Sequence, residues 1–91
     1  MKILIVDDEP LARQRLAGLL ESVNGYQICG EASTGDQAVQ LAQELHPDIL
    51  LLDIRMPGMD GLEAAHHLNR MSKPPAIIFT TAFNDHALQA F

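Results

Sequence analysis

The sequence is poor in cysteine and has no long apolar segment. Cys29 is the single cysteine among 91 residues, so the chain cannot form an internal disulfide bond, and we expect a reducing, cytoplasmic setting. Its apolar runs are far shorter than the roughly 18 residues that cross a bilayer. The first run ends in acidic residues, unlike a signal peptide. No glycine-rich phosphate loop is present. The sequence therefore argues against membrane insertion and against a nucleotide-binding loop.

Positive charge is also scarce. Six Lys and Arg residues stand against twelve Asp and Glu residues, which gives a net charge of -6 at pH 7. Contact with nucleic-acid phosphates needs clustered Lys and Arg, so any binding to DNA would require a domain outside this chain. The hydrophobic share of 47% and the charged share of 20% are typical of a folded globular domain. The length allows one domain, residues 1–91.

Four short apolar runs predict β-strands at residues 2–6, 26–30, 48–52 and 76–80. The first, third and fourth runs show no alternation of apolar and polar residues, which is the pattern of parallel strands that are buried on both faces. The second run is more polar and suits an edge strand. Helical spacing between the runs gives the order βαβαβαβα. This alternation predicts an α/β fold, a doubly wound parallel sheet with helices on both faces.

Each predicted helix has an apolar stripe and a start signal. Pro10 favours the first helix start. Thr34 with Gln37 forms a possible capping box for the second helix, and Asp60 with Glu63 has an analogous arrangement for the third. Asn84 or Asp85 would cap the fourth. The expected buried stripes are Ala12, Leu16, Leu19, Leu20 and Val23; Ala38, Leu41, Ala42 and Leu45; Ala64, Leu68 and Met71; and Ala87, Leu88 and Phe91.

Acidic and hydroxyl side chains follow the predicted strands. Asp7, Asp8 and Glu9 come after the first strand, Asp53 comes after the third, and Thr-Thr-Ala at 80–82 closes the fourth. Ligands of open α/β sheets bind beyond the carboxyl ends of the strands. Crowded carboxylates are unfavourable unless a cation joins them or a proton is taken up, and carboxylate oxygens suit Mg²⁺. A carboxylate can also attack phosphorus as a nucleophile.

A plainer interpretation of these acids stays open. Asp8 and Glu9 could serve only as turn and cap residues at a strand end. For Asp48 and Asp60, a turn or cap role is the favoured interpretation. The crowding of negative charge nevertheless predicts a candidate Mg²⁺ site. Asp53 is a candidate nucleophile for phosphoryl transfer, a reaction that depends mainly on positioning and charge neutralisation.

The segments IVDDEP, LLDIRMPGMDG and FTTA together resemble the receiver domains of two-component response regulators. The resemblance runs along all 91 residues and implies a flavodoxin-like sheet with strand order 2-1-3-4. It implies that Asp53 accepts a phosphoryl group from a histidine kinase. It also implies that Asp7 and Asp8, with Asp53 and the backbone carbonyl of Arg55, bind Mg²⁺.

The resemblance assigns further roles near the acceptor. It implies that the hydroxyl of Thr81, which directly precedes Ala82, bonds a phosphoryl oxygen and moves on activation. Pro57 and Gly61 would shape the loop after the acceptor. Arg55 and Phe83 lie two residues beyond Asp53 and Thr81, and they would flank the path of the water that removes the phosphoryl group.

More narrowly, DDEPLAR, LLDIRMPGMDGLEAA and PPAIIFTTAFNDHALQAF are similar to receivers joined to LytTR-type DNA-binding domains. This similarity implies a longer protein that regulates transcription. The family's fifth strand and helix, with a phosphoryl-binding Lys, are not in the sequence, so the receiver is expected to be incomplete at its C-terminus. We therefore expect impaired phosphorylation and an open edge at 76–80 that favours homodimers or other self-association.

Two other functions remain open on sequence alone. A docking or dimerisation module could keep the fold without phosphorylation. A phosphatase that forms an aspartyl phosphate would also use an Asp at a strand end, but such enzymes typically have Asp-x-Asp after the first strand, where this chain has Asp7-Asp8-Glu9. The favoured prediction is a signalling domain that is not an enzyme beyond its own phosphorylation and dephosphorylation.

Overall fold

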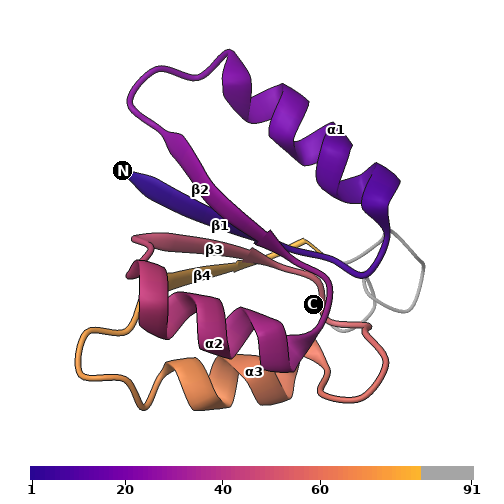
Figure 1. Cartoon of the computed structure of the whole chain (residues 1–91), viewed down its shortest axis with the longest axis vertical. Coiled ribbons are helices and arrows are strands. Elements are labelled where there is room, and N and C mark those ends of the chain that lie inside the picture. The colour runs from indigo at the N-terminus through magenta and orange to yellow at the C-terminus, as the bar shows by residue number, and fades with distance from the viewer. Residues whose placement is uncertain (81–91) are drawn as a thin grey trace, which may run out of the picture.

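The computed structural model describes residues 1–80. Strands and helices alternate along the chain as β1 (Lys2–Val6), α1 (Pro10–Glu21), β2 (Gln27–Ala32), α2 (Gly35–Leu45), β3 (Ile49–Leu52), α3 (Gly61–Leu68) and β4 (Ala76–Phe79). All strand pairs are parallel, and the sheet order is β2-β1-β3-β4 (Figure 1). The predicted fold class and strand order are confirmed.

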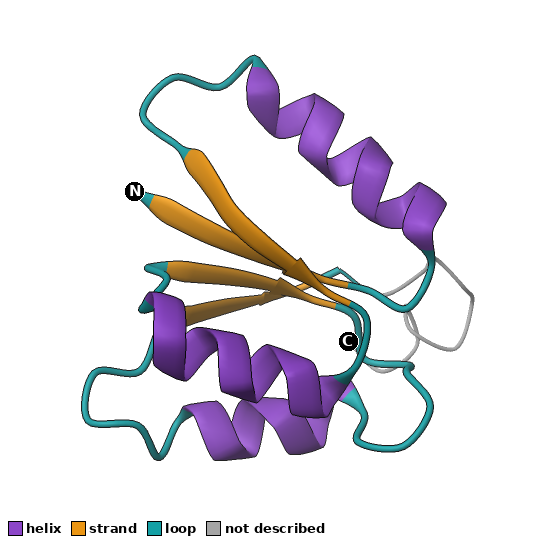
Figure 2. Cartoon of the chain, viewed as in Figure 1, coloured by secondary structure: helices purple, strands orange, loops and turns teal. Residues whose placement is uncertain are grey.

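The sheet lies between two helical layers. Helix α1 covers one face, and α2 and α3 lie side by side on the other (Figure 2). Successive residues of β1 point to opposite faces, so Ile3 and Ile5 join the core under α1 while Leu4 and Val6 join the core under α2 and α3. Burial on both faces explains why the central strands show no alternation. Within residues 1–80, no helix is both long enough and apolar enough to cross a membrane.

Several boundaries and burial assignments differ from the sequence prediction. Strand β2 runs to Ala32 rather than to residue 30, although it lies at the edge as expected. Leu19 is 65% exposed and Val23 is 41% exposed, so their place in the buried stripe of the first helix was predicted wrongly. Helix α1 meets the sheet mainly through Leu16, Ala17 and Leu20. Residue 19 lies about 100° around the helix from residue 20, and Val23 follows the end of the helix.

Strand β4 is the other edge of the described sheet. Ile77 packs partly on the core beneath α2 and α3, whereas Ile78 is 51% exposed and Phe79 is 42% exposed. Burial of this strand on both faces was therefore predicted wrongly for residues 1–80, because the described helices leave Ile78 and Phe79 largely uncovered. No described strand pairs with the outer side of β4. The expected open edge is present in that part of the chain. The predicted fourth helix lies outside the described residues.

Side-chain hydrogen bonds cap the starts of α2 and α3. The Thr34 hydroxyl accepts a hydrogen bond from the backbone N–H of Gln37 at 3.1 Å. The Gln37 side chain accepts from the backbone N–H of Ser33 at 2.8 Å, one residue earlier than a capping box predicts. Asp60 accepts from the backbone N–H of Glu63 at 2.9 Å, which confirms its role as a cap.

Candidate functional site

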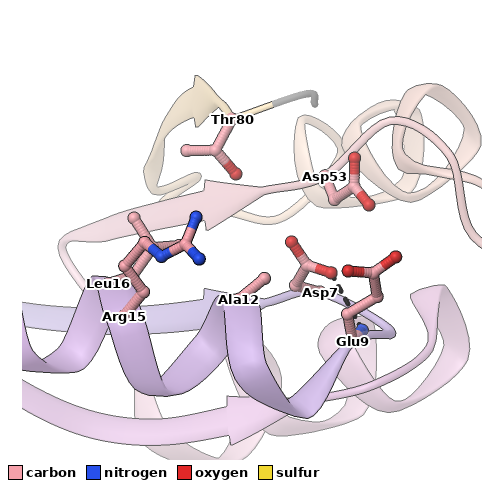
Figure 3. Close-up of a pocket in the computed structure, with 7 residues that line it drawn as sticks. All are labelled: Asp7, Glu9, Ala12, Arg15, Leu16, Asp53 and Thr80. Carbon is pink, nitrogen blue, oxygen red and sulfur yellow. Dashed lines mark hydrogen bonds between the residues drawn. The ribbon is translucent and has the colours of Figure 1, made fainter. Parts of the chain in front are cut away.

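The register of the sheet brings two acidic side chains to one place. Val6 of β1 pairs with Leu52 of β3, so Asp7 and Asp53 follow the strands at neighbouring positions. The Asp53 backbone N–H donates to the Val6 carbonyl at 3.0 Å, and that of Asp7 donates to the Ala32 carbonyl at 3.0 Å. These bonds extend the ladder past the strand ends. Figure 3 shows the two carboxylates directed into the same space.

The residues of this cluster suit a hard divalent cation. One carboxylate oxygen each from Asp7, Asp8 and Asp53 lies within 4.8 Å of the others. Asp7 and Asp53 are each only 7% exposed, whereas Asp8 is exposed. Mg²⁺ favours one or two carboxylates, retained waters and phosphate oxygens. Two buried carboxylates and one exposed carboxylate, with their oxygens close together, meet the first of those requirements.

Hydrogen bonds orient the two buried carboxylates. Asp7 Oδ1 accepts from the backbone N–H of Glu9 at 2.9 Å, and Asp53 Oδ1 accepts from the backbone N–H of Arg55 at 3.3 Å. In each case the donor lies two residues after the acid, in the same loop, and it fixes the position of one carboxylate oxygen. Glu9 occupies the N-cap position of α1 without a capping side-chain bond, and its backbone N–H orients Asp7.

Burial raises the pKa of the Asp53 carboxyl above its usual value of 3.8, and the negative charge of Asp7 raises it further. The hydrogen bond from the Arg55 N–H lowers this pKa, and the charge of Asp8 raises it. Desolvation and like charge both disfavour the ionised form. Without a cation, therefore, the ionised site is electrostatically unfavourable.

This shift predicts a pH-dependent stability. A carboxyl whose folded pKa is raised contributes stability below its unfolded pKa, near 3.8, and loses that contribution as the pH rises through the folded pKa. In chelator, we expect the unfolding free energy of the wild type to fall relative to that of Asp53→Asn across this window. Denaturant unfolding at a series of pH values measures the difference. A difference that is flat or rises with pH would contradict the raised pKa.

A cavity of about 260 Å³ adjoins the acidic cluster. Its described lining comes from the loop after β1, from α1, and from the residues that directly follow β3 and β4. It consists of Asp7, Glu9, Ala12, Arg15, Leu16, Asp53 and Thr80. In Figure 3 the Arg15 guanidinium extends from α1 toward the side of the cavity where Thr80 lies. The space is large enough for a phosphoryl group and water beside the carboxylates.

The loop after Asp53 returns close to the acceptor. The Gly61 N–H donates to the Ile54 carbonyl at 2.8 Å, and a Cβ at Gly61 would lie 2.2 Å from the Asp53 carbonyl oxygen. Gly61 is therefore required by close backbone approach. Pro57 is exposed in this loop, and the Arg55 side chain is exposed beside the acceptor.

Thr80 is one of the hydroxyl residues that close the fourth predicted strand, and it lines the cavity. Its hydroxyl is buried without a hydrogen-bond partner among residues 1–80. Thr81, which the resemblance favours, lies outside the described residues, as do Ala82 and Phe83. Arg13 contacts the acidic loop, although no sequence pattern singled it out, and it donates to the Asp7 carbonyl. A Cβ at Gly35 would lie 2.5 Å from the Met59 carbonyl oxygen. No residue pattern marked the contacts of Arg13 and Gly35, because they depend on how α1 and α2 pack against the neighbouring loops.

A parallel sheet in the order 2-1-3-4, with carboxylates gathered beyond its central strands, defines a class of α/β proteins with an acidic pocket at the strand ends. The family model described as "Response regulator receiver domain" matches residues 3–91. The chain therefore belongs to the response regulator receiver domain family.

Curated relatives agree with this assignment. The chain is 54% identical over 92 residues to "Positive alginate biosynthesis regulatory protein" of Pseudomonas aeruginosa, a match that covers 100% of this chain and 37% of that protein. It is 45% identical over 91 residues to "Sensory transduction protein LytT" of Bacillus cereus, again covering 100% and 37%. The predicted likeness to receivers of LytTR-type regulators is confirmed. The chain spans little more than a third of the length of these relatives.

Solved structures share the fold. The response regulatory domain of protein mrkE from Klebsiella pneumoniae aligns with a TM-score of 0.84 at 35% identity, covering 100% of this chain and 75% of that one. The CheX-CheY-BeF3-Mg+2 complex from Borrelia burgdorferi aligns with a TM-score of 0.84 at 28% identity, covering 98% and 68%.

Proposed function

We propose that this chain is the phosphoacceptor switch of a two-component response regulator. Asp53 takes a phosphoryl group from the phosphohistidine of a histidine kinase, and Asp7, Asp8 and Asp53 hold Mg²⁺ with the backbone carbonyl of Arg55. The observation that carries this proposal is the convergence of three carboxylate oxygens within 4.8 Å at the ends of β1 and β3. A cluster of this charge is explained by a cation site and is otherwise unfavourable.

The transfer is a displacement at phosphorus. A carboxylate oxygen of Asp53 forms the new O–P bond, the N–P bond of phosphohistidine breaks, and its electron pair returns to the imidazole nitrogen. The product is an acyl phosphate on Asp53. When bound, Mg²⁺ supplies neutralisation of the phosphoryl oxygens. The bond from the Arg55 N–H to Asp53 Oδ1 leaves the other oxygen as the candidate nucleophile.

Residues around the acceptor would bind the phosphoryl group and set how long it persists. Thr81 would bond a phosphoryl oxygen, with Ala82 allowing close approach, and this contact would shift a two-state equilibrium at the end of β4. Arg55 and Phe83 would flank the attacking water and set the lifetime of the phosphoryl group. In a longer protein, the switch would control transcription through a DNA-binding domain outside this chain.

The comparisons support this proposal at the level of the family. A structural neighbour is described as a CheY complex with BeF3 and Mg+2, and other neighbours are response regulators. The neighbour's description names an anion and a cation together. The cation would fit this chain's carboxylate trio, and the adjoining cavity has room for the anion.

The test is phosphoryl transfer from acetyl phosphate to the protein, followed by intact mass. We expect a single phosphoryl adduct in Mg²⁺ and none in excess chelator, because uncompensated negative charge on the site and the donor opposes attack. Labelling that is equal with and without Mg²⁺ would contradict the metal assignment. If labelling fails here but appears in a form extended beyond Phe91, the site stands and a further residue is required.

A second candidate is a docking or self-association module. It is favoured by β4, whose outer edge is unpaired within residues 1–80 and carries the exposed side chains Ile78 and Phe79. Open edges of this kind pair readily with other chains. Absence of any labelling, in both the chain and an extended form, would favour this function over the switch.

A further inference from the structure

The loop that carries the acidic pair is held by one side chain from α1. Arg13 Nη1 donates to the backbone carbonyl of Asp7 at 2.6 Å, and Arg13 Nε donates to Glu31 Oε1 at 3.2 Å. The Arg13 side chain is 19% exposed and that of Glu31 is 45% exposed. One guanidinium therefore joins the first turns of α1, the end of β1 and the end of β2.

The contact to the carbonyl is the stronger of the two. A charged donor at 2.6 Å makes a short, charge-assisted hydrogen bond, whereas a half-exposed ion pair such as Arg13–Glu31 contributes little. The Asp7 backbone has two ties to other elements, its N–H to the Ala32 carbonyl and its carbonyl to Arg13. Together they fix the two peptide units that flank the Asp7 Cα. The position of the Asp7 side chain and the backbone direction at Asp8 follow from those two peptide units.

We propose that Arg13 is a positioning residue for the cation site, one that holds the Asp7–Asp8 backbone in the conformation that binds the divalent ion. This inference rests on the proposed function, because it assigns Arg13 a role toward the same metal. Arg13 does not act through its charge on the cation, since a positive charge near the site repels a cation. Its effect comes from geometry, as for outer partners that orient metal ligands.

For Arg13→Met, an effect of charge and an effect of geometry would change the Mg²⁺ affinity in opposite directions. If charge alone mattered, Arg13→Met would strengthen Mg²⁺ binding by removing a repulsive cation. If Arg13 positions the loop, Arg13→Met weakens Mg²⁺ binding by about tenfold, the lower end of the range found when an outer-shell partner is lost. Arg13→Lys keeps the charge but lacks the planar fork that joins two acceptors, and it should also weaken binding.

The experiment is titration of the full-length protein with Mg²⁺, followed by calorimetry or by backbone amide NMR shifts. Glu31→Gln should change the dissociation constant by less than about twofold, because the pair is exposed and the bond to Asp7 remains. Arg70→Met removes an exposed positive charge just after the end of α3 and serves as the charge control. Thermal unfolding in chelator shows whether each variant is folded. If Arg13→Met is unfolded, Arg13→Lys takes its place in the Mg²⁺ titration.

The outcomes separate this inference from the function beneath it. A wild type that does not bind Mg²⁺ would overturn the metal assignment and this inference with it. A wild type that binds, together with a folded Arg13→Met of equal or higher affinity, would overturn the inference alone. Loss of affinity in Glu31→Gln as large as in Arg13→Met would also overturn it, because the ion pair and not the Asp7 contact would then be the cause.

Discussion

Asp53→Asn should abolish phosphorylation by acetyl phosphate, while the folded structure persists. The amide is close in size to the carboxylate, and the backbone bond between Asp53 and Val6 remains. The amide oxygen is a poor nucleophile toward phosphorus, so no acyl phosphate forms. Replacing a buried carboxylate beside Asp7 with a neutral group also removes like-charge repulsion. We therefore expect total loss of the adduct by intact mass, together with unchanged or higher stability near neutral pH in chelator.

A matched variant distinguishes this result from a general loss of acidic charge. Asp36→Asn removes one exposed carboxylate from the first turn of α2 that is not among the three converging acids, and should label as the wild type does. A phosphoryl adduct that survives in Asp53→Asn would show that another residue is the acceptor. Peptide mapping of the adduct would then identify it.

Gly61→Ala should destabilise the fold by about 3 kcal/mol, as strong overpacking does, and should impair phosphorylation at the same time. The added Cβ would lie 2.2 Å from the Asp53 carbonyl oxygen and 2.7 Å from the Ile54 Cα. Both are backbone atoms that no side-chain rotation can move aside. Alanine gains up to about 1 kcal/mol over glycine in a helix, but this gain is smaller than the expected steric penalty. The strain falls on the loop that carries the acceptor.

The control for Gly61→Ala is Gly18→Ala, in the middle of α1, where an added Cβ would meet nothing within 4 Å. Helix propensity then acts alone, and the expected change is a stabilisation of up to about 1 kcal/mol. Denaturant unfolding gives both values. If Gly61→Ala is as stable as Gly18→Ala, the close approach of α3 to the Asp53 backbone is wrong.

The order of elements and the identity of the acidic residues follow from the amino-acid pattern alone. Apolar runs too short for helices, separated by helical stripes, leave a parallel α/β sheet as the compact arrangement. Local signals such as Thr34 and Asp60 marked the starts of α2 and α3, because a cap acts within one turn of its own position. The cluster of Asp7, Asp8 and Asp53 was also predictable, since parallel strands end at the same edge.

The tertiary structure decided the contacts that depend on how the helices pack against the sheet and its strand ends. Leu19 fits the helical period but faces outward, because only a narrow stripe of α1 meets the sheet. The bond from Arg13 to the Asp7 carbonyl, and the approach of Gly61 to Asp53, depend on where α1 and α3 sit against the strand ends. Periodicity reports which face of an element is apolar. It does not report the packing distances that determine which backbone atoms meet, and those distances give the acidic pocket its geometry.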